Sequence, residues 1–270
     1  MNITYYIQLF DDHLADCQWL RFNERTPVGA AQPGEFEAVL EEARGEHLVV
    51  ILPAAAVVLH KVNLLAKSRS QIQAALPFAL EEQIASDVDD MHFAYRTLDR
   101  QSGEQLVAAV GRPLMEGLFE RLMQRKYLSI RILPQFLAVP FQEGQWSLFA
   151  QRDFAIMRKG PSEGYAMDAL AMDELVATEI ELYREQYESP PDVTHYNFSG
   201  TEGEGREHLL GGDAEALAVM ARYCLDHADE EINMLQGDFQ VVKPMADLIR
   251  QWSMVAGLAG VALFFYLVTV

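Results

Sequence analysis

The sequence predicts an α/β protein body followed by one membrane-spanning helix, and three observations support this fold class. Half of the 270 residues are hydrophobic and 23% are charged, which is the composition of a folded domain. Strand-like and helix-like stretches alternate along residues 1–250. Residues 251–270 contain no charged side chain, and a helix of that length is roughly 30 Å long, about the thickness of the bilayer core.

The first elements are strands. Residues 2–9 and 15–22 have strand-like patterns and are joined by an acidic turn at Asp11–Asp12. Residues 34–44 predict a helix, and residues 47–52 (HLVVIL) predict a buried strand. In the next strand, residues 57–64, one face is shared by alternate side chains: Val58, His60, Val62 and Leu64.

A helix follows, because Ser68 and Gln71 have the spacing of a capping box. Apolar residues then recur every four positions: Ile72, Leu76, Leu80 and Ile84. Pro77 lies inside this pattern and is expected to kink or divide the helix. Residues 92–98 and 104–111 predict two more strands.

The chain around residue 140 has the character of a boundary. Pro113 opens a helix whose core face comprises Met115, Leu118, Phe119 and Leu122. Pro134, Pro140 and Gly144 then mark a break between two halves. We therefore expect two β-rich halves, each ending in helices, and not one continuous sheet.

The second half begins with a predicted three-strand meander over residues 146–150, 154–160 and 164–169. An acidic helix is expected over residues 171–188, and a strand over residues 193–198. Asp213 is suited to cap a last helix, whose apolar face comprises Leu217, Met220, Ala221, Cys224 and Leu225.

The charged residues limit the classes of partner and predict how the chain is oriented in a membrane. The formal net charge is −19, which argues against a nucleic-acid partner, because such binding depends on Lys and Arg neutralising phosphates. Lys243, Arg250 and Trp252 precede the apolar segment, where basic and aromatic side chains anchor a helix at the cytoplasmic side of a membrane. We therefore expect a cytoplasmic N-terminal body and a single membrane span. The chain is then either a tail-anchored protein or a truncated piece of a longer protein. A buried core helix is the alternative interpretation of this segment.

Within the predicted span, small residues lie four positions apart: Ser253 and Gly257, Ala256 and Gly260. This spacing lets two helices approach closely, so it is the expected pairing face between copies of the chain. A second candidate surface is the acidic helix. Its side chains Glu179, Glu181 and Glu185 form either a solvated face or a docking surface for a basic partner.

Catalytic, cofactor and metal sites are not predicted. Gly211–Gly212 precede a helix but fit a simple turn, and no phosphate-binding glycine motif occurs. Asp11 and Asp12 fit a turn better than a nuclease metal site. The seven histidines lack metal-ligand spacing, and Cys17 and Cys224 are too few for a disulfide framework or a zinc site.

Four segments together resemble the inner-membrane protein L of the type II secretion system. They are residues 73–95 (QAALPFALEEQIASDVDDMHFAY), 106–122 (LVAAVGRPLMEGLFERL), 132–140 (ILPQFLAVP) and 232–239 (INMLQGDF). The resemblance implies an actin-like body of two RNase H-like lobes that has lost nucleotide binding. Its first lobe, with an inserted β-rich subdomain, would span residues 1–140 and its second lobe residues 141–240. A juxtamembrane linker, 241–252, and the transmembrane helix, 253–270, would follow.

The resemblance also implies a non-enzymatic platform in the bacterial inner membrane. Such a protein recruits the secretion ATPase, protein E, and pairs with protein M and with a second copy of itself. In nucleotide-binding actin-like proteins, phosphate turns with glycine follow the first strand of each lobe. Here IQLFDDH and AQRDF lack that glycine. An actin-like ATPase that still binds nucleotide, similar to pilus-assembly proteins, remains the alternative.

Overall fold

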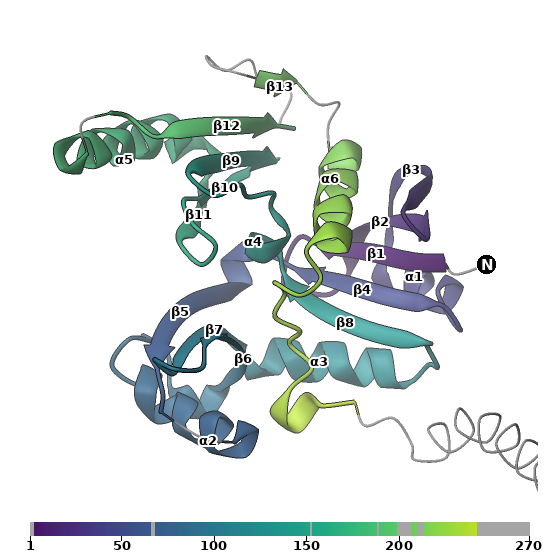
Figure 1. The fold of residues 1–270 in the computed structure, drawn as a ribbon. Helices are drawn as coiled ribbons and strands as arrows, with labels where there is room; N and C mark the ends of the chain where they lie inside the picture. Colours follow the sequence, from purple (N-terminus) through teal and green to yellow (C-terminus); the bar gives the residue numbers. More distant parts are fainter. Residues whose placement is uncertain are drawn as a thin grey trace, which may run out of the picture. The chain divides into compact units, whose positions relative to one another are not determined.

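The computed structural model describes residues 3–65, 68–151, 153–187, 189–198, 207–209 and 213–241. Residues up to Phe239 form one compact unit, and a second unit begins at Gln240. Sheets and helices of the first unit are shown in Figure 1. The α/β class predicted from the alternating pattern is confirmed.

The first sheet has five strands in the order β3-β2-β1-β4-β8. Strands β1, β2 and β3 are antiparallel neighbours, whereas β4 is parallel to β1 and β8 is parallel to β4. The strands are β1 Ile3–Leu9, β2 Asp16–Asn23, β3 Thr26–Glu35, β4 His47–Leu52 and β8 Ser129–Pro134.

The second sheet repeats this plan with the order β11-β10-β9-β12-β13. Its directions also match, because β9, β10 and β11 are antiparallel neighbours and β12 and β13 continue in parallel from β9. The strands are β9 Gln145–Gln151, β10 Phe154–Arg158, β11 Gly164–Asp168, β12 Asp192–Asn197 and β13 Glu207–Leu209. Strand β9 thus corresponds to β1 in its place in the strand order and in the directions of its neighbours.

A three-stranded sheet is inserted into the chain between β4 and α3 (Arg112–Met123). It has the order β5-β7-β6 and is antiparallel throughout: β5 Val57–Asn63, β6 Met91–Asp99 and β7 Glu104–Gly111. Helix α2 (Arg69–Leu80) covers one face and encloses a small core of its own, which includes Ile72, Leu76 and Phe93. The expected lobe boundary at residue 140 stays a prediction, because the lobes and the inserted sheet belong to one compact unit.

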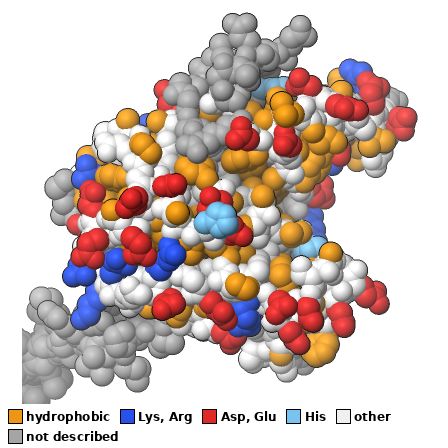
Figure 2. All heavy atoms as spheres, turned by 180° about the vertical axis from the view of Figure 1, so that it is seen from behind, with side chains coloured by type: hydrophobic (Ala, Val, Ile, Leu, Met, Phe, Trp, Pro, Cys, Tyr) orange, Lys and Arg blue, Asp and Glu red, His pale blue; other side chains and the backbone are white. Residues whose placement is uncertain are grey.

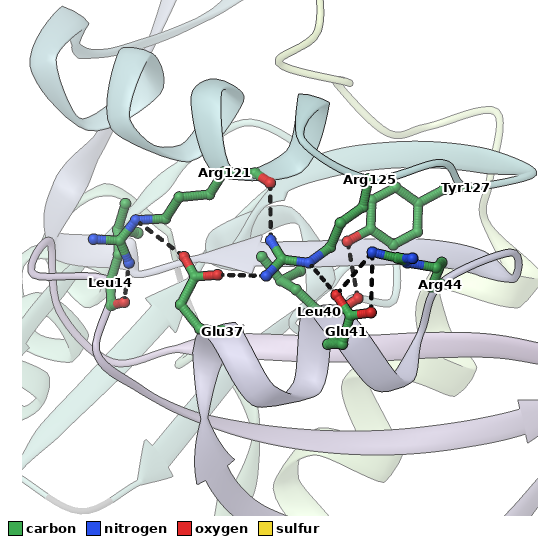
Figure 3. Close-up of polar contacts among 8 residues, drawn as sticks. All are labelled: Leu14, Glu37, Leu40, Glu41, Arg44, Arg121, Arg125 and Tyr127. Atoms are coloured by element: carbon green, nitrogen blue, oxygen red, sulfur yellow. Dashed lines mark hydrogen bonds and ion pairs between the residues drawn. The ribbon is translucent and has the colours of Figure 1, made fainter.

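Helices α1 (Phe36–Glu42) and α3 pack against the first sheet and are joined to each other by charged side chains (Figure 3). Arg125, just past the end of α3, donates to Glu37 at 2.8 Å and to Glu41 at 3.0 Å. Helix α6 (Asp213–Asp226) contacts β3, β2 and the short helix α4 (Gln135–Ala138). Helix α5 (Met172–Gln186) packs on the second sheet.

Most predicted elements are confirmed, with informative differences. Ser68 caps α2 as expected, accepting from the Gln71 N–H at 3.3 Å. The helix runs through Pro77 without a break, so the expected division there is wrong; Leu76 and Leu80, both fully buried, hold the helix against the inserted sheet. Strands β3 and β8 were not predicted, because glycine and proline interrupt the first and the second ends in Pro134.

Candidate functional site

The two central strands, β1 and β9, are joined by a buried pair of glutamines at their carboxyl ends. Gln8 Nε2 donates to Gln151 Oε1 at 2.8 Å, and Gln151 Nε2 donates to Gln8 Oε1 at 3.3 Å. Both side chains are fully buried. Gln135, at the start of α4, donates to Gln151 Oε1 at 3.4 Å, and its own oxygen accepts from the Ala54 N–H at 3.0 Å. Each of these buried side-chain amides thus has a hydrogen-bond partner, as buried polar groups require.

The glutamine cluster lies near the carboxyl ends of β1 and β9, where the family resemblance places the phosphate turns of nucleotide-binding actin-like proteins. After β1, Asp11 and Asp12 are exposed, and Asp11 Oδ1 accepts from the His13 N–H at 2.9 Å. This contact is an Asx turn, the turn interpretation that the sequence favoured. Gln8 and Gln151 face each other directly, so side chains fill the space between the two strand ends.

The acidic helix α5 is attached to the second sheet by Glu179. Its carboxylate accepts from Lys159 Nζ at 2.8 Å and from the Tyr165 hydroxyl at 3.0 Å. The bond from Lys159 lowers the pKa of the Glu179 carboxyl. Burial, reinforced by Glu179, raises the pKa of Tyr165 to about 12. Glu179 is therefore a packing residue of the helix.

Glu181 and Glu185 lie on the outer face of α5. Glu181 is 67% exposed and bonds only to Arg184 within the same helix among the described contacts, at 2.7 Å, while Glu185 is exposed. Two leucines share the exposed part of the helix, Leu175 at 38% and Leu182 at 55% exposure. Of the three predicted docking glutamates, Glu179 therefore faces the sheet, whereas Glu181 and Glu185 face outward. The exposed Leu175 and Leu182 were not predicted as part of this surface. Their spacing of seven residues was the available signal, since it places both leucines on one helix face.

Residues 232–239, which we call the exit segment, precede the second unit and are fixed to two sheets. The Met234 N–H donates to Ile132 O on β8 at 2.8 Å, and His92 Nε2 on β6 donates to Met234 O at 2.7 Å. Gln236 contacts the edge of β6 with both ends of its amide, accepting from Tyr95 N–H at 3.2 Å and donating to Tyr95 O at 3.0 Å. Burial lowers the pKa of His92, so its ring is neutral at physiological pH.

Phe239 ends this segment and the first unit. Its ring packs edge-on against His92, at 4.8 Å between centroids, and against Phe119 of α3, at 5.5 Å. Both terminal nitrogens of Arg112 lie 3.1 Å from the same oxygen of Asp238. The exit segment therefore connects the first sheet, the inserted sheet and α3 immediately before Gln240, where the second unit begins.

One partly buried ion pair lies just before the exit segment. Glu231, whose side chain is 8% exposed, contacts Arg131 of β8. Burial raises the pKa of the Glu231 carboxyl to about 7, although the nearby Arg131 opposes the shift. Cys224 of α6 is its neighbour, and burial raises the pKa of that thiol far above its usual range.

Nucleophile and metal chemistry find no support in the described part of the chain. Cys17 and Cys224 are free and buried, and burial raises the pKa of the Cys17 thiol to about 12, so neither forms a thiolate at neutral pH. Among the described residues, no group of three or more His, Cys, Asp or Glu side chains is placed to hold a metal ion.

Several predicted site residues lie outside the described residues. They are Gly211 and Gly212, the anchor residues Lys243, Arg250 and Trp252, and the pairing residues Ser253, Ala256, Gly257 and Gly260. Within the ranges that the structure does describe, no helix is both long and apolar enough to cross a bilayer.

Comparisons with known proteins agree with one another. Residues 7–241 match the family model described as type II secretion system (T2SS), protein L. The type II secretion system protein L of Vibrio cholerae is 26% identical over 264 residues, which are 94% of this chain and 62% of that protein. Its counterpart from Dickeya chrysanthemi is 23% identical over 250 residues, 91% of this chain and 59% of that protein. This chain thus spans about 60% of the length of these relatives.

A solved structure gives the same fold. It is described as the cytoplasmic domain of EpsL, an inner membrane component of the type II secretion system of Vibrio cholerae. The TM-score is 0.69 at 23% sequence identity, and the match covers 88% of this chain and 100% of that one.

Proposed function

The chain belongs to the protein L family of the type II secretion system, and from this premise we propose that it is a non-enzymatic platform at the bacterial inner membrane. Its cytoplasmic body recruits the secretion ATPase, protein E, into a complex with protein M. This assignment requires three features: a body that does not depend on nucleotide, a surface for the ATPase, and a firm connection to the anchor.

The observation that carries the non-enzymatic assignment is the Gln8–Gln151 pair. In an actin-like ATPase the ends of the two equivalent strands hold the nucleotide phosphates. Here two fully buried amides bond to each other between those ends. A phosphate entering this space would have to break buried hydrogen bonds, each of which is expensive to leave unmade. This argues against the alternative, an ATPase that retains nucleotide binding.

The docking surface that we propose for the ATPase is the outer face of α5. It combines the carboxylates of Glu181 and Glu185 with the exposed side chains of Leu175 and Leu182. Apolar contacts surrounded by charge are typical of protein interfaces, and a negative field speeds association with a basic partner. Glu179 holds α5 on the second sheet through its hydrogen bonds with Lys159 and Tyr165.

The anchor that we propose is the apolar segment after residue 252, with Lys243, Arg250 and Trp252 at the cytoplasmic boundary. Ser253, Ala256, Gly257 and Gly260 form its pairing face. The exit segment supports a mechanical role, because it joins the body to the anchor through contacts with two sheets and α3. Loss of sodium carbonate-resistant membrane association on deletion of residues 251–270 would support the anchor, and retention would remove it.

Membrane recruitment tests the platform directly. Inner-membrane vesicles that contain the chain should sediment the N-terminal domain of the cognate ATPase, whereas vesicles without it should not. A matched vesicle sample with the Glu181→Lys/Glu185→Lys variant should recruit less. Equal sedimentation in all three samples would contradict the proposal.

A further inference from the structure

Arg158, the last residue of β10, is a cation that the fold buries, with only 2% of its surface exposed. On the face drawn in Figure 2, by contrast, Lys and Arg side chains lie at the surface among Asp and Glu side chains. An arginine stays charged at neutral pH, and a buried charge is unfavourable unless its surroundings replace the water that it loses. The groups around Arg158 must therefore supply that replacement.

The guanidinium of Arg158 donates hydrogen bonds to main-chain oxygens. Its Nη1 donates to Val139 O and, at 3.3 Å, to Leu137 O. Its Nε donates to Gly160 O at 3.3 Å, and its Nη2 donates to Pro161 O at 3.2 Å. Within the described part of the chain, these oxygens take the place that a carboxylate has in an ion pair.

Three aromatic rings complete the surroundings of the guanidinium. Its central carbon lies 5.6 Å from the ring centroid of Phe136, 5.1 Å from that of Phe141 and 5.4 Å from that of Tyr223. These distances are within the range in which an aromatic face attracts a cation. Burial lowers the pKa of the guanidinium, and the nearby Tyr223 opposes this shift. We call the four oxygens and three rings the Arg158 cage.

The members of the cage come from different parts of the fold. Four belong to residues 135–144, the connection from β8 of the first sheet to β9 of the second: Phe136, Leu137, Val139 and Phe141. Tyr223 belongs to α6, which follows the second sheet in the chain but contacts β1, β2 and β3 of the first sheet. Figure 1 shows α4, at the start of the connection, between the two sheets. Arg158 thus joins the second sheet to the connection and to a helix held by the first sheet.

The cage lies at the opposite end of β9 from the glutamine pair. Arg158 is the register partner of Ser147, near the start of β9, whereas Gln151 is the last residue of that strand. Four residues of strand separate these two positions, which corresponds to roughly 13 Å. A single contact between two sheets permits rotation about that contact. Contacts at both ends of one strand remove this freedom.

We propose that Arg158 is a conformational lock between the two sheets. Its cage fixes the connection and α6 to the end of β10, and together with the Gln8–Gln151 pair it keeps the sheets in one relative orientation. The body then moves as one piece without hinge closure. This inference concerns the fold of the body alone, so it does not depend on which partner the chain recruits.

Distance measurements between two spin labels on the full chain test the lock. Leu128→Cys, just before β8, and Leu170→Cys, just after β11, carry the labels, because these side chains are 57% and 97% exposed. Cys17 and Cys224 are buried and take up little label. Double electron–electron resonance should give one narrow distance distribution for this labelled chain.

Arg158→Met removes the charge and the donors but keeps a long apolar side chain. It should broaden the distance distribution by about twofold, because the sheets then rotate about the remaining contact. Met157→Ala is the matched control, since Met157 precedes Arg158 on β10 but packs in the separate core between the second sheet and α5. It should lower the melting temperature and leave the width of the distribution unchanged.

Arg158→Lys provides a second arm that retains the charge, so it tests the lock even if Arg158→Met does not fold. One ammonium cannot reproduce the fork of a guanidinium, so this variant should also broaden the distribution, although less. Amide hydrogen exchange should become about tenfold faster in residues 135–144 and stay unchanged in the inserted sheet. An unbroadened distribution with unchanged exchange in the Arg158 variants, or equal broadening by Met157→Ala, would overturn the proposal.

Discussion

Gln8 and Gln151 exchange two hydrogen bonds between the central strands of two sheets that share one topology, 143 residues apart in the chain. Gln8 is the next-to-last residue of β1 and Gln151 is the last residue of β9, and these two strands correspond to each other in the two sheets. A contact that is reciprocal, fully buried and positioned at both strand ends gives the two halves a fixed relationship without any ligand. This feature is the structural basis for the platform proposal.

Single replacement of either glutamine should destabilise the body. Gln8→Leu leaves the Gln151 amide without its reciprocal partner, and an unsatisfied buried amide costs about 1–3 kcal/mol. The Gln8→Leu/Gln151→Leu double variant should lose less than the sum of the two single variants, because no orphaned amide of the pair remains. Urea denaturation of the four proteins measures this coupling. Strict additivity would mean that the pair does not act as a unit.

Glu179 and the outer glutamates of α5 should respond differently to mutation. Glu179→Gln removes the charge that Lys159 contacts at 2.8 Å, and the free energy of unfolding should fall by about 1–2 kcal/mol. Glu181→Lys/Glu185→Lys should leave the melting temperature nearly unchanged, since exposed ion pairs contribute little to stability.

ATPase pulldown separates the two roles of α5. The Glu181→Lys/Glu185→Lys variant should bind the ATPase less strongly, and Leu182→Asp should weaken binding further. Glu179→Gln should retain binding at temperatures where it is folded. Unchanged pulldown by both outer-face variants would remove the docking proposal while leaving the packing role of Glu179 intact.

The exit segment should depend on Phe239. This ring is 5% exposed and packs on His92 and Phe119, so Phe239→Ala should cost about 2–4 kcal/mol. Amide hydrogen exchange should become faster at Met234 and Leu235, because the end of the segment is no longer held. Val241→Ala is the control, since Val241 is 41% exposed. Equal exchange in both variants would show that Phe239 does not fix the segment.

The free energy of unfolding should decrease as pH rises, because of Glu231. The pKa of its carboxyl is about 7 in the folded protein, above its ordinary value of 4.5. The folded state therefore binds more protons than the unfolded state between these values, and the free energy of unfolding decreases as pH rises through this window, by at most about 3 kcal/mol. Glu231→Gln should flatten this part of the profile in chemical denaturation at several pH values. An unaltered slope would assign the pH dependence to other groups.

Local patterns predicted much of the fold. Helix α3 was predicted from its proline start and apolar spacing, and Met115, Leu118 and Leu122 are fully buried. The meander β9-β10-β11 and helix α5 followed from alternation and from helical spacing. These elements carry their signal within a few neighbouring residues, which is why one sequence was enough.

The remaining features depend on contacts that are distant in sequence. Strand β3 contains two prolines and two glycines and forms because β2 pairs with it. The three predicted glutamates could not be separated by pattern, because Glu179 turns inward only through its contacts with Lys159, just past the end of β10, and with Tyr165 of β11. No local rule relates Gln8 to Gln151, since the duplication that brings them together is visible only in strand order.

The most direct test of the platform account is a thermal-shift titration of residues 1–241 with Mg-ATP, run beside a titration with the N-terminal domain of the cognate ATPase. A ligand at 100 times its dissociation constant stabilises the folded state by about 2.7 kcal/mol, which is a shift of a few degrees for a domain of this size. We predict such a shift with the ATPase domain and none with Mg-ATP. A shift with Mg-ATP would contradict the account and identify the chain as a nucleotide-binding actin-like protein.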